Sequence, residues 1–145
     1  MKQLGIKVIL LTCFLLIFAA DTFAVTNPPA DDLKLTDAYQ VLALRRAEVK
    51  AELQFLNTTL TGRHPDVLRK QDQLDSITEE MDRLERSGKP FEKLISSYGH
   101  LLLKKALVAA ELKTLRRSFR SSHPLVIAKK NEWIALDSEA ERIVK

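Results

Sequence analysis

The chain carries an internal repeat with an offset of 59 residues, and this duplication limits its fold more than any other feature. When residues 34–84 are laid over residues 93–143 without a gap, 17 of the 51 positions are identical. The matches include Tyr39 with Tyr98, which a shared spacing of leucines would not produce. Self-similarity at a fixed period is the sequence signature of one structural unit used more than once. We therefore expect two copies of the same structure in tandem.

Each copy contains two segments in which apolar residues recur every three or four positions, the spacing of an amphipathic helix. Alternation with period two, which would indicate strands, is absent. We predict an all-α fold of two tandem antiparallel helical hairpins, residues 34–86 and 93–145, packed as a coiled-coil-like four-helix bundle or extended as a pair of hairpins. In the first copy the apolar stripes are Leu35, Tyr39, Leu42, Val49, Leu53, Leu56 and Leu60, then Val67, Leu74, Ile77, Met81 and Leu84. In the second copy they are Leu94, Tyr98, Leu101, Val108, Leu112, Leu115 and Phe119, then Val126, Trp133, Leu136, Ala140 and Ile143.

A His-Pro pair separates the two helices of each copy, as His64-Pro65 and His123-Pro124. Proline is favoured at the first position of a helix, where its missing N–H removes no hydrogen bond. It also moves the preceding residue out of helical geometry. We therefore expect these four residues to define a turn and the start of the second helix in each hairpin.

The segment between the copies predicts a linker at residues 87–92. Gly88 suits the end of a helix, and a proline two positions later suits a restart. Gly99 is a weak point in the third helix because glycine has a low helix propensity. That helix can instead begin at Ser96 or Ser97, with the serine as its cap.

The first 24 residues have the layout of a secretory signal peptide. A short basic segment precedes residues 8–20, where only Thr12 is polar, and small residues lead to a cleavage site after Ala24. The apolar run is shorter than the roughly 20 residues that span a membrane, although an uncleaved anchor is the alternative. We expect a periplasmic or secreted protein.

The residues that follow, 25–33, form an expected extended leader with two consecutive prolines. Asp31 or Asp32 would cap the first helix, which we expect to begin near Lys34. About 27 residues of helix correspond to roughly 40 Å, and about 20 residues in the returning helix to roughly 30 Å.

Composition argues against several classes of site. The single cysteine, Cys13, lies in the predicted signal peptide, so the mature chain would have no disulfide and no thiolate ligand. His64 and His123 belong at the hairpin turns and His100 at the opposite end, which does not suit a metal site. The four glycines form no phosphate-binding fingerprint, and a net charge of +4 is mild. We expect no metal, cofactor, small-molecule substrate, nucleic acid or catalysis.

The hairpin pattern also resembles a known family. Ala51-Glu52-Leu53 leads to His64-Pro65-Asp66-Val67, and Ala110-Glu111-Leu112 leads to His123-Pro124-Leu125-Val126. This order is similar to the periplasmic coiled-coil hairpins of bacterial polysaccharide co-polymerases and exopolysaccharide chain-length-determinant proteins. The resemblance covers the hairpin alone and implies a module of a bacterial envelope assembly.

Several residues are candidate contacts with a partner. Arg46 and Lys105 interrupt the apolar stripe at equivalent positions of the repeat. A basic residue there can specify register or oligomer state, or its stem can pack while its charge reaches water. Lys70 and Lys129 raise the same question on the returning helices.

Basic residues also gather near the second turn, as Arg116, Arg117 and Arg120 around Phe119. This tip suits an acidic polymer, lipid head groups or an acidic protein surface, although a solvated helix end has the same composition. Trp133 replaces Leu74 in the repeat, so we expect it in the core, with a partner contact as the alternative.

Two functions fit these features. The first is a non-enzymatic exported adaptor or scaffold whose helices pack against partner proteins or against another copy, in polysaccharide or other export machinery. The second is a periplasmic chaperone that holds unfolded proteins with its basic helices.

Overall fold

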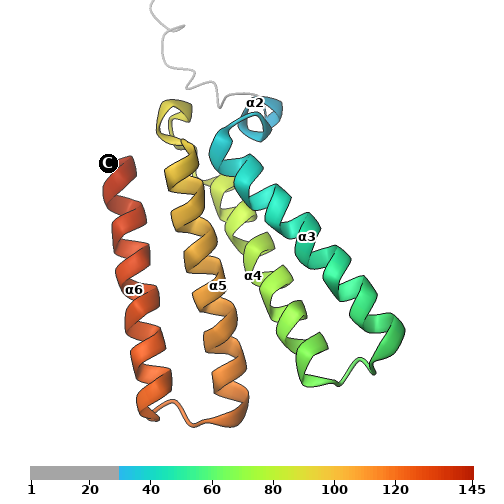
Figure 1. Ribbon diagram of the computed structural model, residues 1–145. Helices are drawn as coiled ribbons and strands as arrows, with labels where there is room; N and C mark the ends of the chain where they lie inside the picture. The colour runs from blue at the N-terminus through green and yellow to red at the C-terminus, as the bar shows by residue number, and fades with distance from the viewer. Residues whose placement is uncertain (1–29) are drawn as a thin grey trace, which may run out of the picture.

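The computed structural model describes residues 30–145 as four long helices joined by short connections (Figure 1). No strand occurs within this range, which confirms the all-α prediction. The predicted signal peptide and residues 25–29 of the leader lie outside it. The elements are α2 (Ala30–Lys34), α3 (Asp37–Thr59), α4 (Pro65–Arg86), the 3₁₀ turn η1 (Phe91–Lys93), α5 (Ser96–Ser118) and α6 (Pro124–Val144).

The two hairpin turns have the same backbone conformation. Leu60, which ends α3, has φ and ψ of −122° and 155°, and its repeat equivalent Phe119 has −129° and 149°. His64 has −62° and 138°, and His123 has −67° and 137°. Each following proline occupies the start of the next helix, as expected. The duplication therefore extends from the sequence to the backbone of the turns.

Each histidine also caps the helix that it precedes. The Nδ1 atom of His64 accepts a hydrogen bond from the backbone N–H of Asp66 at 3.2 Å. His123 accepts one in the same way from Leu125 at 3.3 Å. Capping satisfies one of the backbone donors that the first turn of a helix leaves unpaired. The His-Pro spacing predicted the turns, but it did not predict that the imidazole itself is the cap.

Replacing either histidine with alanine should lower the free energy of unfolding by about 1 kcal/mol, because the cap is lost. The loss should be larger for His123→Ala, since the His123 ring also stacks on Phe119 with centroids 4.2 Å apart. Asparagine at the same positions should retain most of the stability. Urea denaturation followed by circular dichroism measures all four variants, and equal stability of wild type and alanine variants would contradict the capping role.

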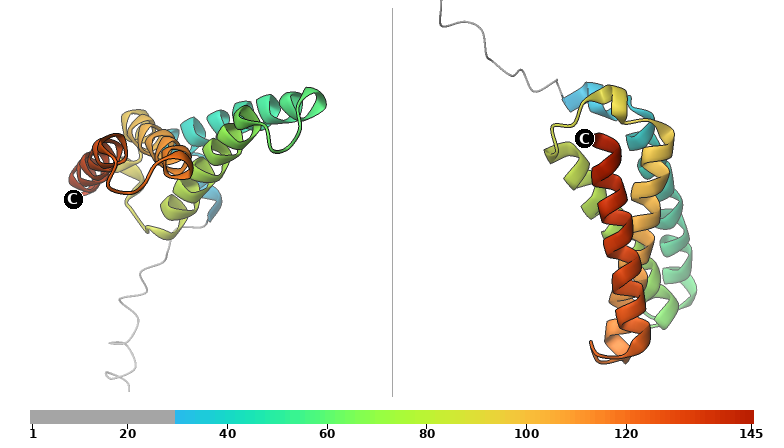
Figure 2. Two further views of the ribbon diagram at one scale, coloured as in Figure 1. Left: turned by 90° about the horizontal axis from the view of Figure 1, so that it is seen from below. Right: turned by 90° about the vertical axis from the view of Figure 1, so that its left-hand side faces the viewer.

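The four long helices lie side by side in the order α6, α5, α4, α3 (Figure 1). The two hairpins are close at the end that holds α2 and η1, and they diverge toward the His-Pro turns (Figure 2). Helix α5 packs against α3, α4 and α6, whereas the main packing partner of α6 is α5 alone. Among the described residues, α6 is therefore at one edge of the layer. Helix α3 is outermost on the other side toward the His-Pro turns, although its first turn crosses α5 at Gly99 (Figure 1). No helix of this part of the chain has both the length and the apolar character needed to cross a membrane.

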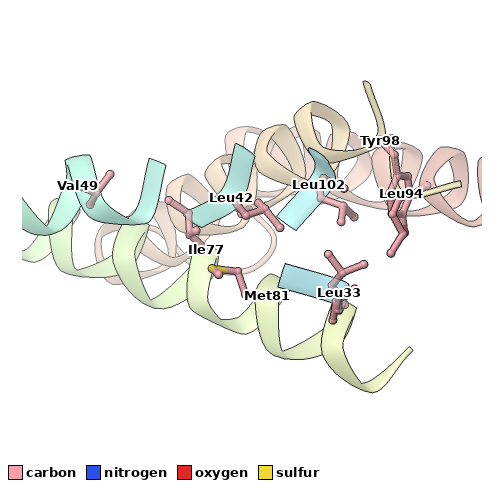
Figure 3. Packing of buried hydrophobic residues seen from close by; sticks show 12 residues of the cluster. Leu33, Leu42, Val49, Ile77, Met81, Leu94, Tyr98 and Leu102 are labelled. Atoms are coloured by element: carbon pink, nitrogen blue, oxygen red, sulfur yellow. The ribbon is translucent and has the colours of Figure 1, made fainter. Parts of the chain in front are cut away.

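The core lies where the hairpins converge. Leu42, Ile77 and Leu94 are almost fully buried there (Figure 3). Helix α6 contributes only Ala140 to the buried members of this cluster. The buried cluster consists of Leu33, Ala38, Leu42, Val49, Ile77, Met81, Leu84, Leu94, Tyr98, Leu102, Ala106 and Ala140.

The start of the first long helix differs from the prediction. Helix α3 begins at Asp37, and its cap is Thr36, whose Oγ1 accepts from the N–H of Tyr39 at 3.4 Å. Neither Asp31 nor Asp32 caps α3, and the last residues of the expected extended leader form the short helix α2 instead. Leu35 is consequently outside the apolar stripe and is 73% exposed. With 23 residues, α3 is about 35 Å long instead of 40 Å.

Gly99 is also not the weak point that the sequence suggested. Helix α5 begins at Ser96, as one alternative proposed, but its N-cap is Ile95 and no serine side chain caps it. A Cβ atom on Gly99 would lie 2.6 Å from the Cα of Ala38, so glycine allows α5 and α3 to cross in direct contact. Close by, the N–H of Ala38 donates to the carbonyl of Leu94 at 3.1 Å. The expected glycine at the end of the second helix is confirmed, because Gly88 has φ of 58°.

Candidate interaction surfaces

Lys105 is an internal residue and not a surface contact. It is 5% exposed, and its Nζ lies 2.9 Å from Glu80 on α4 and 2.9 Å from Asp137 on α6. The ammonium also lies 5.9 Å from the ring centre of Trp133, which is half-buried instead of fully in the core. The interpretation in which the charge of Lys105 reaches water is therefore wrong. Lys105 on α5 therefore links α4 and α6 through its two ion pairs.

Arg46, at the equivalent position of the first copy, has different surroundings. It is half-buried on α3 and lines an open hollow of about 700 Å³ between α3 and α4, together with Thr78 and Asp82. Thr78 stands where the second copy has Asp137. Among the side chains that the structure describes, Arg46 has no ion-pair partner. The same basic position of the repeat is thus buried and ion-paired in the second copy, whereas in the first copy it lines an open hollow.

Lys70 and Lys129 hold the two helices of each hairpin together. Lys70 forms an ion pair with Glu52, and Lys129 forms the equivalent pair with Glu111 at 2.7 Å. Glu132 is a second partner of Lys129, at 2.8 Å. All four members of the repeated pair are identical between the copies, which is the sequence signal that could have predicted the pairing. These lysines are therefore intrahairpin contacts.

The repeated pairs should make stability depend on pH at both ends of the scale. The hydrogen bond from Lys70, opposed in part by burial, lowers the pKa of Glu52, and the hydrogen bonds to Glu111 and Glu132 raise the pKa of Lys129. The contribution of Glu52 is present above the pKa that it has in the unfolded chain and is lost as the pH falls through the folded pKa. The contribution of Lys129 is present below its unfolded pKa and is lost as the pH rises through the folded one.

We expect Glu52→Gln and Lys129→Gln each to destabilise the protein at neutral pH by at most about 1 kcal/mol, because both pairs are solvent-accessible. The difference in free energy of unfolding between variant and wild type should become smaller in acid for Glu52→Gln and in strong base for Lys129→Gln. Urea denaturation across a pH series provides the measurement, with Glu92→Gln on the exposed η1 as a control for removal of one acid. A difference that stays constant with pH would contradict the assignment.

The basic tip of the second hairpin is partly used inside the chain. Arg117 donates from both terminal nitrogens to the carboxylate of Asp72 on α4, at 2.6 Å each. Asp72 is 3% exposed and also accepts from the hydroxyl of Thr114 at 3.1 Å. Arg117 thus connects the hairpins although its side chain is 46% exposed, and Arg116 and Arg120 are the exposed cations of this group without an ion-pair partner among the described residues.

Apolar side chains are exposed on the outer face of α3. Leu44 is 66% exposed and Phe55 is 68% exposed, so Phe55 is not a core residue. Ala47 and Ala51 lie between them and are also exposed. The steps of three and four residues place all four on one side of the helix. Sequence reasoning missed this stripe because it followed only the stronger apolar face of the same helix.

Helix α6 exposes large apolar side chains as well. Ile127 and Ile134, 46% and 45% exposed, lie on one side of the helix, whereas Leu125, 53% exposed, lies on another side and lines a hollow between α4, α5 and α6. Only Val126 and Ala140 of this helix are buried. Ile143 was predicted to belong to the apolar stripe but is 37% exposed. The two edge helices of the layer therefore both present large apolar side chains to solvent.

The described residues contain no group of three or more side chains arranged to hold a metal ion. A second open hollow, of about 660 Å³, lies between α4, α5 and α6 and is lined by both charged and apolar side chains, including Leu125, Ala128 and Lys129. No family description, curated protein or solved structure matches this chain. The exposed faces of α3 and α6 are accordingly the candidate binding surfaces of the described residues.

Proposed function

We propose that this protein is a non-enzymatic helical scaffold or adaptor, exported to the bacterial envelope, that binds partner proteins through the outer faces of its edge helices. The observation that carries the proposal is the exposed apolar stripe of α3, bounded by Leu44 and Phe55. Contiguous exposed apolar side chains on a folded chain are typical of a protein-binding surface. Helical segments of a partner suit such a stripe, since an amphipathic helix places its own anchors three and four residues apart.

The arrangement of charge supports the same proposal. Lys105 and Arg117 are engaged by acidic residues of their own chain, and each connects one hairpin to the other. These contacts hold the two hairpins in one relative position, which gives the outer faces a defined geometry. A rigid surface loses little conformational entropy on binding, and that favours a specific partner.

The export of the protein and the kind of assembly to which it belongs are proposed from the sequence. The layout of residues 1–24 supports export, and the hairpin resemblance to polysaccharide co-polymerases supports a partner in polysaccharide or other export machinery. Arg116 and Arg120, exposed at the second turn, supply positive charge for an acidic partner surface or lipid head groups.

A photo-crosslinking residue at Phe55, introduced in cells that naturally produce the chain, tests the proposal directly. We expect one dominant crosslinked protein, with the same result for a probe at Leu44. A probe at Asn57, exposed on another side of α3, should give little product. A heterogeneous set of products would favour the chaperone alternative, and equal labelling from Phe55 and Asn57 would overturn the proposed binding face.

A further inference from the structure

The junction between the two hairpins shows which surface fits the outer face of α3. At this junction α4 packs antiparallel on α5, with Glu80 paired to Lys105 near one end and Asp72 paired to Arg117 near the other. Between these pairs lies Ser76 on α4, which is 1% exposed. Ala106 and Ala110 of α5 are 0% and 2% exposed, so small side chains let the helices approach closely. Repeat equivalence relates α4 to α6 and α5 to α3.

The same two surfaces recur, uncovered, at opposite edges of the chain. On α3, Ala47 and Ala51 are the equivalents of the buried Ala106 and Ala110, yet both are exposed. On α6, the equivalents of Asp72, Ser76 and Glu80 are Asn131, Ala135 and Glu139. Asn131 and Ala135 are exposed, and Glu139 is half-exposed. Each chain thus carries both halves of a helix–helix junction with nothing packed on either among its described residues.

Charge and shape agree with this pairing. Glu80 and its equivalent Glu139 each form an ion pair with the arginine three residues later. The distance is 3.1 Å from Glu80 to Arg83 and 2.7 Å from Glu139 to Arg142. Lys105 of the second copy pairs with Glu80, whereas its equivalent in the first copy, Arg46, faces an open hollow. Two cations of α3, Arg46 and Lys50, line this hollow opposite the α4 carboxylates Asp75, Glu79 and Asp82.

We infer that α6 of one molecule packs on α3 of a second copy of this chain, which repeats the α4–α5 junction between molecules and places Glu139 against Arg46. This inference rests on the proposed function and names a second copy as one partner of the α3 face. Because the contact joins two different surfaces, the α6 face of one molecule and the α3 face of the other, it is head-to-tail. Every dimer therefore retains one uncovered α3 face and one uncovered α6 face. Association then continues into longer assemblies unless a ring closes.

The intermolecular contact is weaker than the internal one. Asn131 replaces Asp72, and Thr58 replaces Arg117, so the bidentate ion pair has no counterpart. Gln40 stands where α5 has Gly99, which prevents an equally close crossing at the convergent end. Reversible assembly that depends on protein concentration is the expected behaviour.

Sedimentation velocity of the purified full-length protein over a concentration series tests the inference. Ala51→Glu blocks the α3 surface and Ala135→Glu blocks the α6 surface. Both positions are exposed within the chain, so folding should be retained, and circular dichroism checks this. Wild type should form species larger than a monomer, and each variant alone should remain monomeric. A mixture of the two should form a 1:1 dimer and nothing larger, because only one intact pair of surfaces remains.

Charge reversal tests the register. Glu139→Arg should weaken association by at least about tenfold, as expected for disruption of one interfacial charge pair. Arg46→Glu in the same chain should restore it. Asn57→Glu, exposed on another side of α3, is the matched control and should assemble like wild type.

The possible outcomes separate this inference from the proposed function. A wild-type protein that stays monomeric at every concentration, or a mixture of blocked variants that fails to dimerise, overturns the second copy as partner. A single different protein crosslinked to Phe55 in cells would then leave the scaffold function standing. If Phe55 yields neither a second copy nor another protein, both proposals fail.

Discussion

Replacing Lys105 with methionine is expected to lower the free energy of unfolding by about 3 kcal/mol, the low end of the range for a broken buried ion pair. Methionine keeps most of the aliphatic volume, so the loss reports the charge. The variant would leave Glu80, which is 5% exposed, without its cation at 2.9 Å. Arg83 still contacts Glu80 at 3.1 Å, which is why the low end applies.

Two further variants identify the cause of this loss. Lys129→Met removes an ion pair of similar length between solvent-accessible side chains and should cost at most about 1 kcal/mol. Adding Glu80→Leu to Lys105→Met removes the carboxylate that the single variant leaves buried without its lysine. The double variant should therefore recover a large part of the stability. Urea denaturation of the three variants and wild type gives the comparison. Similar losses for Lys105→Met and Lys129→Met would show that burial of the cluster contributes nothing.

Gly99→Ala should also destabilise the protein strongly, by about 2 kcal/mol or more. In an isolated helix the change from glycine to alanine stabilises by about 1 kcal/mol. Here the added Cβ would lie 2.6 Å from the Cα and 2.9 Å from the carbonyl oxygen of Ala38. Both are backbone atoms of a packed helix and cannot rotate away, so α3 and α5 must separate and overpacking dominates.

The matched control is Gly62→Ala in the first turn, where an added Cβ meets nothing within 4 Å. We expect little change in stability there. Thermal and urea denaturation of both variants measures the difference. If Gly99→Ala were as stable as wild type, the crossing of α3 and α5 would be loose, and the close packing around Ala38 and Leu94 would not contribute to the fold.

Local features of the fold were predictable because their causes are local. The His-Pro pairs constrain backbone angles within three residues, and both turns lie where these pairs predict them. Leu42, Ile77 and Val126 follow a helical period and are buried as expected. The start of α3 was less predictable, because Thr36 and Asp32 are both suitable caps and only packing of the short α2 selects between them.

The candidate site was less accessible to sequence reasoning. Lys105 and Arg46 occupy equivalent positions, but one is buried and the other lines an open hollow. Ala110 and Ala51 likewise differ only in what lies beside them. Sequence periodicity states which residues share a side of a helix, but it does not state which neighbouring helix covers that side.

The sequence by itself determined the helices, the turns and the duplication, since each depends on propensities and contacts over a few residues. Only the tertiary structure decided which faces are covered, because that depends on how the two hairpins cross at Gly99 and on the ion pairs that join them. Identical repeat residues therefore acquire different environments, as α5 has neighbours on both sides and α3 lies at an edge. Because of this asymmetry, the surface that is buried on α5 is exposed in its repeat equivalent on α3.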